Sequence, residues 1–274
     1  MPAKYFEIGE HAIHVLHAGP TTLPGEPPSF LQGRTLLFLH GAGSTAAVWR
    51  RQIAHFGASH SPVAFDSPGH GRSSGTEALP SVSAYADVAL ALLDRLGVAR
   101  AVLVGSSMGG AVAVDLALRA PDRVEALVLL STTAKFRISQ KSLETWRNVM
   151  LGRAPQPFTT DGYGDDVSFE VMREGWELQV LTDPRVRYFD LLACDAVDHR
   201  ARLGEIRRPA LLIHGTKDTA VAPADGADLA KGIPGARLVE IAGGGHFLYR
   251  ERPDPLHATI DSFLGDLSPR GAFV

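Results

Sequence analysis

Residues 101–110, which read AVLVGSSMGG, decide how this chain is interpreted. An apolar run ends in a turn of the form G-x-S-x-G, and a helix-like stretch follows, so the string lies in a strand-turn-helix context. Such a sharp reversal forces the residue at its apex into a strained backbone conformation, which lifts the side chain clear of the sheet. Glycine is required on both sides because a Cβ there would collide with the reversing backbone. The spacing therefore predicts Ser107, and not its neighbour Ser106, as an exposed nucleophile.

A serine hydroxyl is a poor nucleophile at neutral pH, so it requires a base and a group that orients the base. Of the eleven histidines, His246 follows an apolar stretch and the glycines 243–245, a loop that we expect to be flexible enough to fold inward. Asp218 follows the buried-strand pattern of residues 209–215, at a strand end where catalytic groups collect. Serine, then acid, then histidine is the chain order of one known architecture, so Ser107, Asp218 and His246 are the predicted triad.

Three other histidines are expected to have structural roles. His40 and His70 are each predicted to stabilise their own loop through hydrogen bonds, and His214 lies inside an expected strand. No H-E-x-x-H string and no paired-cysteine spacing occurs, so the sequence predicts no zinc site. No cofactor is implied.

Five motifs in the right order resemble those of the α/β-hydrolase family. Besides the serine turn they are HGAG at residues 40–43, PGHGRS at 68–73, GTKD at 215–218 and GGH at 244–246. The resemblance covers nearly the whole chain apart from a middle segment, and it implies a mostly parallel central sheet flanked by helices. It also implies an oxyanion hole made by the backbone amides of Ala42 and Met108, and the second of these would gain from a helix N-terminus. One departure is Gly244, where many relatives carry alanine or a small polar residue; we expect it to loosen the histidine loop.

The alternation of strands and helices stops between residues 133 and 205. This segment instead carries helical stripes of apolar residues separated by turns rich in glycine, proline and aspartate. By resemblance it is the family's cap, inserted into a core made of residues 1–132 and 206–274. Its aromatic residues, such as Trp146 and Trp176, are expected mainly in the interior of the cap. The part that lines a pocket would favour apolar acyl or aromatic groups over charged ones.

Composition excludes several other classes of protein. The 274 residues are 45% apolar, and 27 basic and 30 acidic residues give a net charge of −3 without long runs, which predicts neither a nucleic-acid nor a membrane partner. Cys194 is the only cysteine, so an internal disulfide is excluded and a reducing compartment is favoured. No signal-like N-terminus and no stretch long enough to span a bilayer is present, and we expect a cytoplasmic protein.

These observations predict a serine hydrolase that cleaves small apolar carboxylic esters or lactones through an acyl-enzyme. Carbon-carbon bond hydrolases often share the Ser-Met-Gly-Gly string of residues 107–110 and are the main alternative. Cofactor-free perhydrolases usually carry proline shortly after the His-Gly pair, where this chain has Ala-Gly-Ser at 42–44. Dehalogenases and epoxide hydrolases place aspartate at the turn, which argues against them. A small-molecule receptor on the same fold, without turnover, is the alternative from another class.

Overall fold

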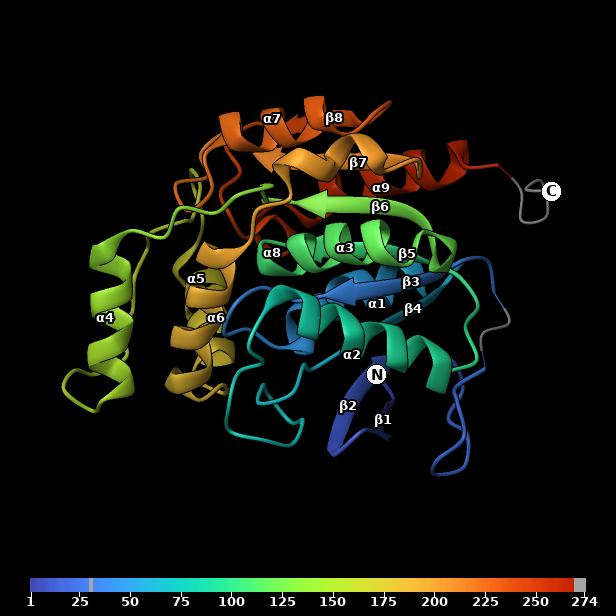
Figure 1. Cartoon of the computed structure of the whole chain (residues 1–274), viewed down its shortest axis with the longest axis horizontal. Helices are drawn as coiled ribbons and strands as arrows, with labels where there is room; N and C mark the ends of the chain where they lie inside the picture. Colours follow the sequence, from blue (N-terminus) through green and yellow to red (C-terminus); the bar gives the residue numbers. More distant parts are fainter. Residues whose placement is uncertain (30–31, 269–274) are drawn as a thin grey trace.

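The computed structural model describes residues 1–29 and 32–268, and its centre is one β-sheet (Figure 1). Within those residues the sheet has eight strands in the order β1-β2-β4-β3-β5-β6-β7-β8. Strand β2 pairs antiparallel with β1 and β4, and all other neighbours pair in parallel, so the predicted mostly parallel sheet is confirmed. The strands are β1 (Ala3–Ile8), β2 (His11–His17), β3 (Thr35–Leu39), β4 (Ser61–Phe65), β5 (Ala101–Ser106), β6 (Val124–Leu130), β7 (Ala210–Gly215) and β8 (Arg237–Ile241).

The order of the strands reverses direction at β3. Strand β4 lies on one side of β3 and β5 on the other, so the loops that leave β3 and β5 diverge. In open parallel sheets a ligand binds at such a reversal of strand order. Both the HGAG motif and the serine turn lie on these two loops.

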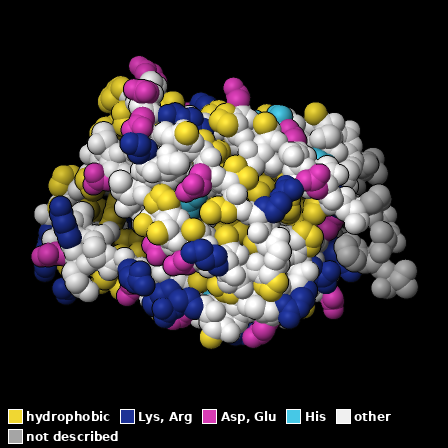
Figure 2. All heavy atoms as spheres, turned by 90° about the horizontal axis from the view of Figure 1, so that it is seen from above, with side chains coloured by type: hydrophobic (Ala, Val, Ile, Leu, Met, Phe, Trp, Pro, Cys, Tyr) yellow, Lys and Arg dark blue, Asp and Glu magenta, His cyan; other side chains and the backbone are white. Residues whose placement is uncertain are grey.

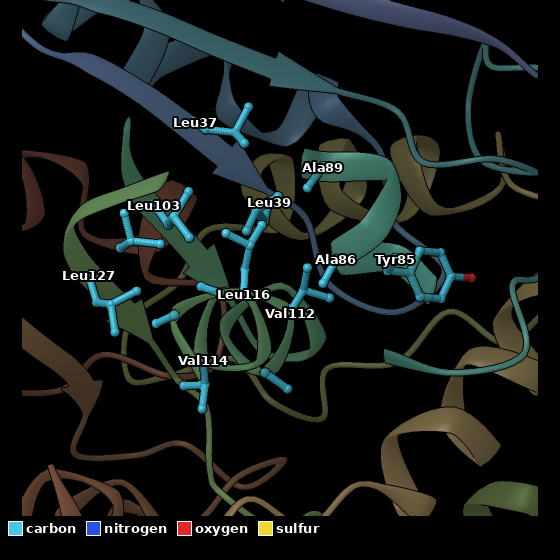
Figure 3. Close-up of a cluster of buried hydrophobic side chains, with 14 of the residues drawn as sticks. Leu37, Leu39, Tyr85, Ala86, Ala89, Leu103, Val112, Val114, Leu116 and Leu127 are labelled. Carbon is cyan, nitrogen blue, oxygen red and sulfur yellow. The ribbon is translucent and has the colours of Figure 1, made fainter. Parts of the chain in front are cut away.

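Helices cover both faces of the sheet. On one face lie α2 (Val82–Arg95), α3 (Met108–Arg119) and α7 (Pro223–Gly232), and on the other α1 (Arg50–Phe56) and α9 (Pro253–Asp266). Figure 3 shows side chains of α2 and α3 meeting those of β3, β5 and β6 in one buried apolar cluster. Helix α2 begins where Ser81 accepts a hydrogen bond from the amide of Ala84, which satisfies one of the free donors of the first turn. The short helices are η1 (Ala46–Trp49), η2 (Pro121–Arg123) and α8 (Leu248–Glu251).

Residues 133–205 form helices between β6 and β7, at the end of the molecule toward which the parallel strands point (Figure 1). They are α4 (Gln140–Met150), α5 (Phe169–Gln179), α6 (Pro184–Ala196) and η3 (Arg200–Glu205). The apolar stripes indicated α4 and α5 but not α6, whose signal is an Asp-Pro start at residues 183–184. The expectation for the aromatic residues is right for Trp146, which is buried. It is wrong for Phe158 and Phe169, whose exposed fractions are 44% and 59%.

The face of the molecule shown in Figure 2 carries charges of both signs. On the face shown in Figure 2, acidic and basic side chains alternate with small hydrophobic areas. Across residues 1–29 and 32–268, no helix is both long enough and apolar enough to cross a membrane. Cys194 is buried in α6, as expected for a small apolar side chain.

Candidate active site

Ser107 has the strained backbone that the turn motif predicts. Its φ is 55° and its ψ is −120°, and it stands directly before the first residue of α3. A Cβ on Gly105 would lie 2.2 Å from the carbonyl oxygen of Gly109, and a Cβ on Gly109 would lie 2.2 Å from that of Leu39. Because both contacts are to backbone, neither position can hold a side chain without moving the strands. Ser106, by contrast, is buried as the last residue of β5.

The predicted acid and base are paired. The Nδ1 atom of His246 lies 2.9 Å and 3.1 Å from the two carboxylate oxygens of Asp218. Nδ1 must therefore carry the proton that it donates, which leaves Nε2 as the ring nitrogen free to accept one. The side chain of Ser107 makes no hydrogen bond to any described residue. Ser107, Asp218 and His246 follow β5, β7 and β8, which end at the same edge of the sheet.

His214, expected only as a strand residue, supports the acid. Its Nε2 lies 3.3 Å from Asp218 Oδ2 and 2.9 Å from the carbonyl oxygen of Val221, while the amide of Val221 donates to Asp218 Oδ1 at 2.9 Å. Burial raises the pKa of Asp218, but the proximity of His246 and the hydrogen bonds from His214, His246 and Val221 outweigh burial and hold that pKa well below its usual range. Asp218 is thus an ionised carboxylate suited to orienting an imidazole. In the sequence Asp218 lies four residues after His214, and this short separation was the available indication that the two side chains interact.

The histidine loop makes several hydrogen bonds to neighbouring segments, and the loosening expected from Gly244 stays a prediction. The amide of His246 donates to the carbonyl oxygen of Gly162 at 2.6 Å, and the amide of Asp165 donates to that of Gly243 at 2.9 Å. Glu251 accepts hydrogen bonds from the amides of residues 164, 245 and 247, each at 2.8 Å. Glycine permits this close approach of two backbones, because a Cβ on Gly164 would lie 2.1 Å from the carbonyl oxygen of Gly243.

Of the two backbone amides predicted to stabilise an oxyanion, that of Ala42 lies on the loop after β3 and that of Met108 begins α3, directly after the serine. A Cβ on Gly41 would lie 3.3 Å from the Cβ of Ser107, so the loop after β3 passes directly by the turn. Within the described chain, the amides of Ala42 and Met108 donate no hydrogen bond, as expected for groups available to a ligand. Met108 is the first residue of α3, where amides have no partner inside the helix. No group of three or more His, Cys, Asp or Glu side chains in residues 1–29 and 32–268 is arranged to hold a metal ion.

Asp190 of α6 is a site residue that the sequence analysis missed. One of its carboxylate oxygens accepts hydrogen bonds from the amide of Gly43 and from Nε2 of His70, both at 2.8 Å, and the other accepts one from the hydroxyl of Tyr85. Figure 3 shows the oxygen of Tyr85 pointing away from the apolar cluster that surrounds its ring. His70 therefore does more than stabilise its own loop, because it also binds the inserted helix. Asp190 is fully buried, and it fixes the loop that carries Ala42.

The charges in this cluster support one another. Burial lowers the pKa of His70, but the charge and the hydrogen bond of Asp190 outweigh burial and raise it. Burial raises the pKa of Asp190, and His70, Tyr85 and the amide of Gly43 together lower it below its usual value. His40 behaves differently: burial lowers its pKa to about 4, and it stabilises its loop in the neutral form, as expected. Its Nε2 accepts a hydrogen bond from the amide of Ser67 at 3.1 Å.

Comparison with known proteins identifies the family. Residues 34–253 match the family model described as the alpha/beta hydrolase fold, which is well over half of the chain. The chain belongs to the α/β-hydrolase fold family. The α/β-hydrolase fold class predicted from the sequence is therefore confirmed, and its relatives establish the chain as a hydrolase.

Several relatives of this α/β hydrolase have named activities. It is 30% identical to a pimeloyl-(acyl-carrier protein) methyl ester esterase of Aromatoleum aromaticum, over 84% of this chain and 97% of the relative. It is 28% identical to the 2-hydroxy-6-oxo-6-phenylhexa-2,4-dienoate hydrolase of Comamonas testosteroni, over 94% of this chain and 93% of the relative. The crystal structure of an enol-lactonase from Burkholderia xenovorans superimposes with a TM-score of 0.78 at 26% identity, covering 96% of this chain and all of that one. This chain thus resembles a named esterase and a named enol-lactonase over 84% and 96% of its length.

Proposed function

We propose that this α/β hydrolase is a serine hydrolase that cleaves small carboxylic esters or lactones through an acyl-enzyme. The observation that carries the proposal is the strained Ser107 at the same sheet edge as the hydrogen-bonded pair of His246 and Asp218. Relatives named as an esterase and an enol-lactonase support this choice of substrate class.

The proposed reaction uses each group for one task. Nε2 of His246 takes the proton of Ser107 as Oγ attacks the ester carbonyl, and the amides of Ala42 and Met108 hold the negative charge that develops on the carbonyl oxygen. His246 then gives the proton to the departing alcohol. A water molecule then attacks the acyl-enzyme as His246 takes its proton, and His246 returns that proton to Oγ of Ser107 as the acid is released. Asp218 remains ionised throughout, keeps the imidazole in the required tautomer and stabilises its cation.

Residues 133–205 are proposed to be a cap over this site, inserted into a core of residues 1–132 and 206–274. Two groups of contacts support the proposal. Residues 162–165 bond to the histidine loop, and Asp190 bonds to the loop that follows β3. A substrate enclosed by the cap would reach Ser107 between these two attachments, so the side chains of the cap would select it.

A carbon-carbon bond hydrolase is the second candidate. The observation that favours it is the relative named as a phenylhexadienoate hydrolase, together with the Ser-Met-Gly-Gly string at residues 107–110. Carbon-carbon bond hydrolysis differs from ester hydrolysis in the bond that breaks, and it would use the same serine and histidine. A vinylogous diketone assayed beside esters and lactones distinguishes the two functions, since each class of enzyme turns over its own substrate far faster.

The serine mechanism is tested by variants at adjacent serines. Ser107→Ala is expected to lower kcat on an activated ester by roughly 10⁴- to 10⁶-fold. Ser106→Ala is the matched control and is expected to keep most of the activity, because Ser106 is buried in β5. An organophosphorus reagent should modify the peptide that contains Ser107, as mass spectrometry would show. Labelling of Ser106, or full activity in Ser107→Ala, contradicts the mechanism, and absence of turnover with every substrate class would favour a receptor.

A further inference from the structure

Arg187 stands out because its side chain lies over the loop that carries the proposed oxyanion hole. It belongs to α6, and a Cβ on Gly43 would lie 2.6 Å from its Cβ and Cγ and 2.8 Å from its Cδ. Its guanidinium carbon lies 4.1 Å from the centre of the Trp146 ring, so the cation stacks on an indole of α4. The aliphatic stem of Arg187 is thereby packed against Gly43, the residue next to Ala42, while its charged group lies on Trp146.

Among the described residues, no acid forms an ion pair with this guanidinium, although the charge of Asp190 acts on it. Within residues 1–29 and 32–268, Arg187 forms no hydrogen bond and no ion pair, and its Nε is buried without any polar partner. The nearest acid on the same helix is Asp190, but its oxygens are taken by the amide of Gly43, by His70 and by Tyr85. By contrast, Arg185, two residues earlier, bonds to Asp183 through two of its nitrogens, at 3.0 Å and 2.6 Å.

Leaving the buried Nε of Arg187 without an acceptor is unfavourable. The guanidinium presents five donors in a planar fork that matches a carboxylate, and burying a cation without a partner is unfavourable. Burial lowers the pKa of Arg187 to about 10, and Asp190 and Tyr249 offset part of that effect, so the side chain stays charged at neutral pH. The indole of Trp146 is an attractive surface for the cation, but it accepts none of the in-plane hydrogen bonds. Arg187 is therefore a charged, half-buried side chain with no hydrogen-bond acceptor among the described residues.

We propose that Arg187 binds a free carboxylate on the substrate, so that the ester or lactone cleaved at Ser107 carries a second, negatively charged group. The inference rests on the serine hydrolase function proposed above. It also changes the substrate expected from the apolar composition of the cap, because the acyl part would have an apolar chain that ends in an anion. Stacking on Trp146 and contact with Gly43 hold the guanidinium in place, so little ordering is required when the carboxylate arrives.

Pairs of esters that differ only in this group test the proposal. Methyl butanoate, pentanoate and hexanoate are compared with the monomethyl esters of succinate, glutarate and adipate, in which a carboxylate replaces the terminal methyl group. Hydrolysis is followed by alkali uptake at about pH 8, where the carboxylate and the guanidinium are both charged. At the best chain length, wild-type enzyme is expected to favour the charged ester in kcat/KM by roughly 10- to 100-fold.

Variants then assign the preference to Arg187. Arg187→Met should lower the ratio of the two kcat/KM values by at least roughly tenfold, whatever common factor slows both esters. Arg187→Lys keeps the charge without the fork and should retain part of the preference, which also covers the case in which the methionine variant fails to fold. Arg185→Met is the matched control on the same helix and should leave the ratio as it is in the wild type. A wild-type enzyme that shows no preference for charged esters overturns the proposal, as does a preference that survives in Arg187→Met.

Direct binding separates this proposal from the proposed function. Titration calorimetry with adipate as the probe should show binding to the wild type and to Ser107→Ala, and much weaker binding to Arg187→Met. Equal binding by all three proteins overturns the anion site even if Ser107 proves to be the nucleophile. Loss of binding only in Arg187→Met, with no turnover of any ester, would keep the anion site and reject the hydrolase mechanism.

Discussion

Replacing Asp190 by asparagine should destabilise the protein severely, although the new side chain has nearly the same shape. The carboxylate of Asp190 accepts hydrogen bonds from the amide of Gly43, from His70 and from Tyr85, and it is fully buried. Asparagine offers one acceptor oxygen in place of two, so at least one donor is left unpaired or faces another donor. It also removes the charge that pairs with His70. Breaking a buried pair of this kind costs about 3–5 kcal/mol.

This loss is large enough to measure by thermal unfolding. At roughly 2–4 °C per kcal/mol for a chain of this size, the midpoint for Asp190→Asn should fall by roughly 6–20 °C. Asp198→Asn is the control, because Asp198 lies on the surface just beyond the same helix and, among the described residues, accepts hydrogen bonds only from Arg200. Its midpoint should match that of the wild type. A shift of less than about 2 °C for Asp190→Asn would refute the view that this carboxylate joins the inserted helices to the core.

The effect should also depend on pH in a defined window. The pKa of His70 is raised, so its contribution to stability is complete below the pKa of an unfolded histidine, 6.5, and is lost as the pH rises through the higher folded value. The pKa of Asp190 is lowered, so its contribution is complete above the value of an unfolded aspartate, 3.8, and is lost as the pH falls through the lower folded value. The difference between wild type and Asp190→Asn should therefore be greatest between pH 3.8 and pH 6.5. Urea unfolding across this range measures it, and a difference that grows above pH 8 contradicts the assignment.

Three further predictions concern the turn, the neutral histidine and the cap. Gly109→Ala should give little folded protein, because its Cβ would lie 2.2 Å from the carbonyl oxygen of Leu39. Gly204→Ala is the control, because its Cβ would have no atom within 4 Å, and it should unfold like the wild type. Equal stability of the two variants would contradict the turn geometry. The pKa of His40 is about 4, so the folded protein holds this side chain in its neutral form. Between pH 6.5 and pH 5 the wild type should therefore lose roughly 2 kcal/mol of stability that His40→Asn does not lose. Urea unfolding at both pH values measures the difference. Trp176→Ala should change the ranking of kcat/KM across acyl lengths if the cap selects substrates, and an unchanged ranking in folded protein would assign that selection to the core loops.

The sequence by itself determined the sheet, the serine turn and the pairing of Asp218 with His246. These features depend on local patterns. Apolar runs of strand length, glycines on both sides of Ser107 and loops that follow the strands before Asp218 and His246 can each be read within a few residues. Their positions then follow from topology, because the carboxyl ends of parallel strands meet at one edge of the sheet.

Only the tertiary structure decided how the inserted helices attach to that edge and what charge they bring to it. The hydrogen bond of Asp190 to Gly43 joins residues 147 positions apart, and no local pattern distinguishes Asp190 from the other acids of the chain. The guanidinium of Arg187, which has no hydrogen-bond partner among the described residues, is likewise defined by what surrounds it, since Arg185, two positions earlier, is paired with Asp183 on the surface. Residues that are distant in the sequence determine how deeply a charged side chain is buried and whether it is paired. The polarity proposed for a binding site can therefore differ from the polarity expected from composition.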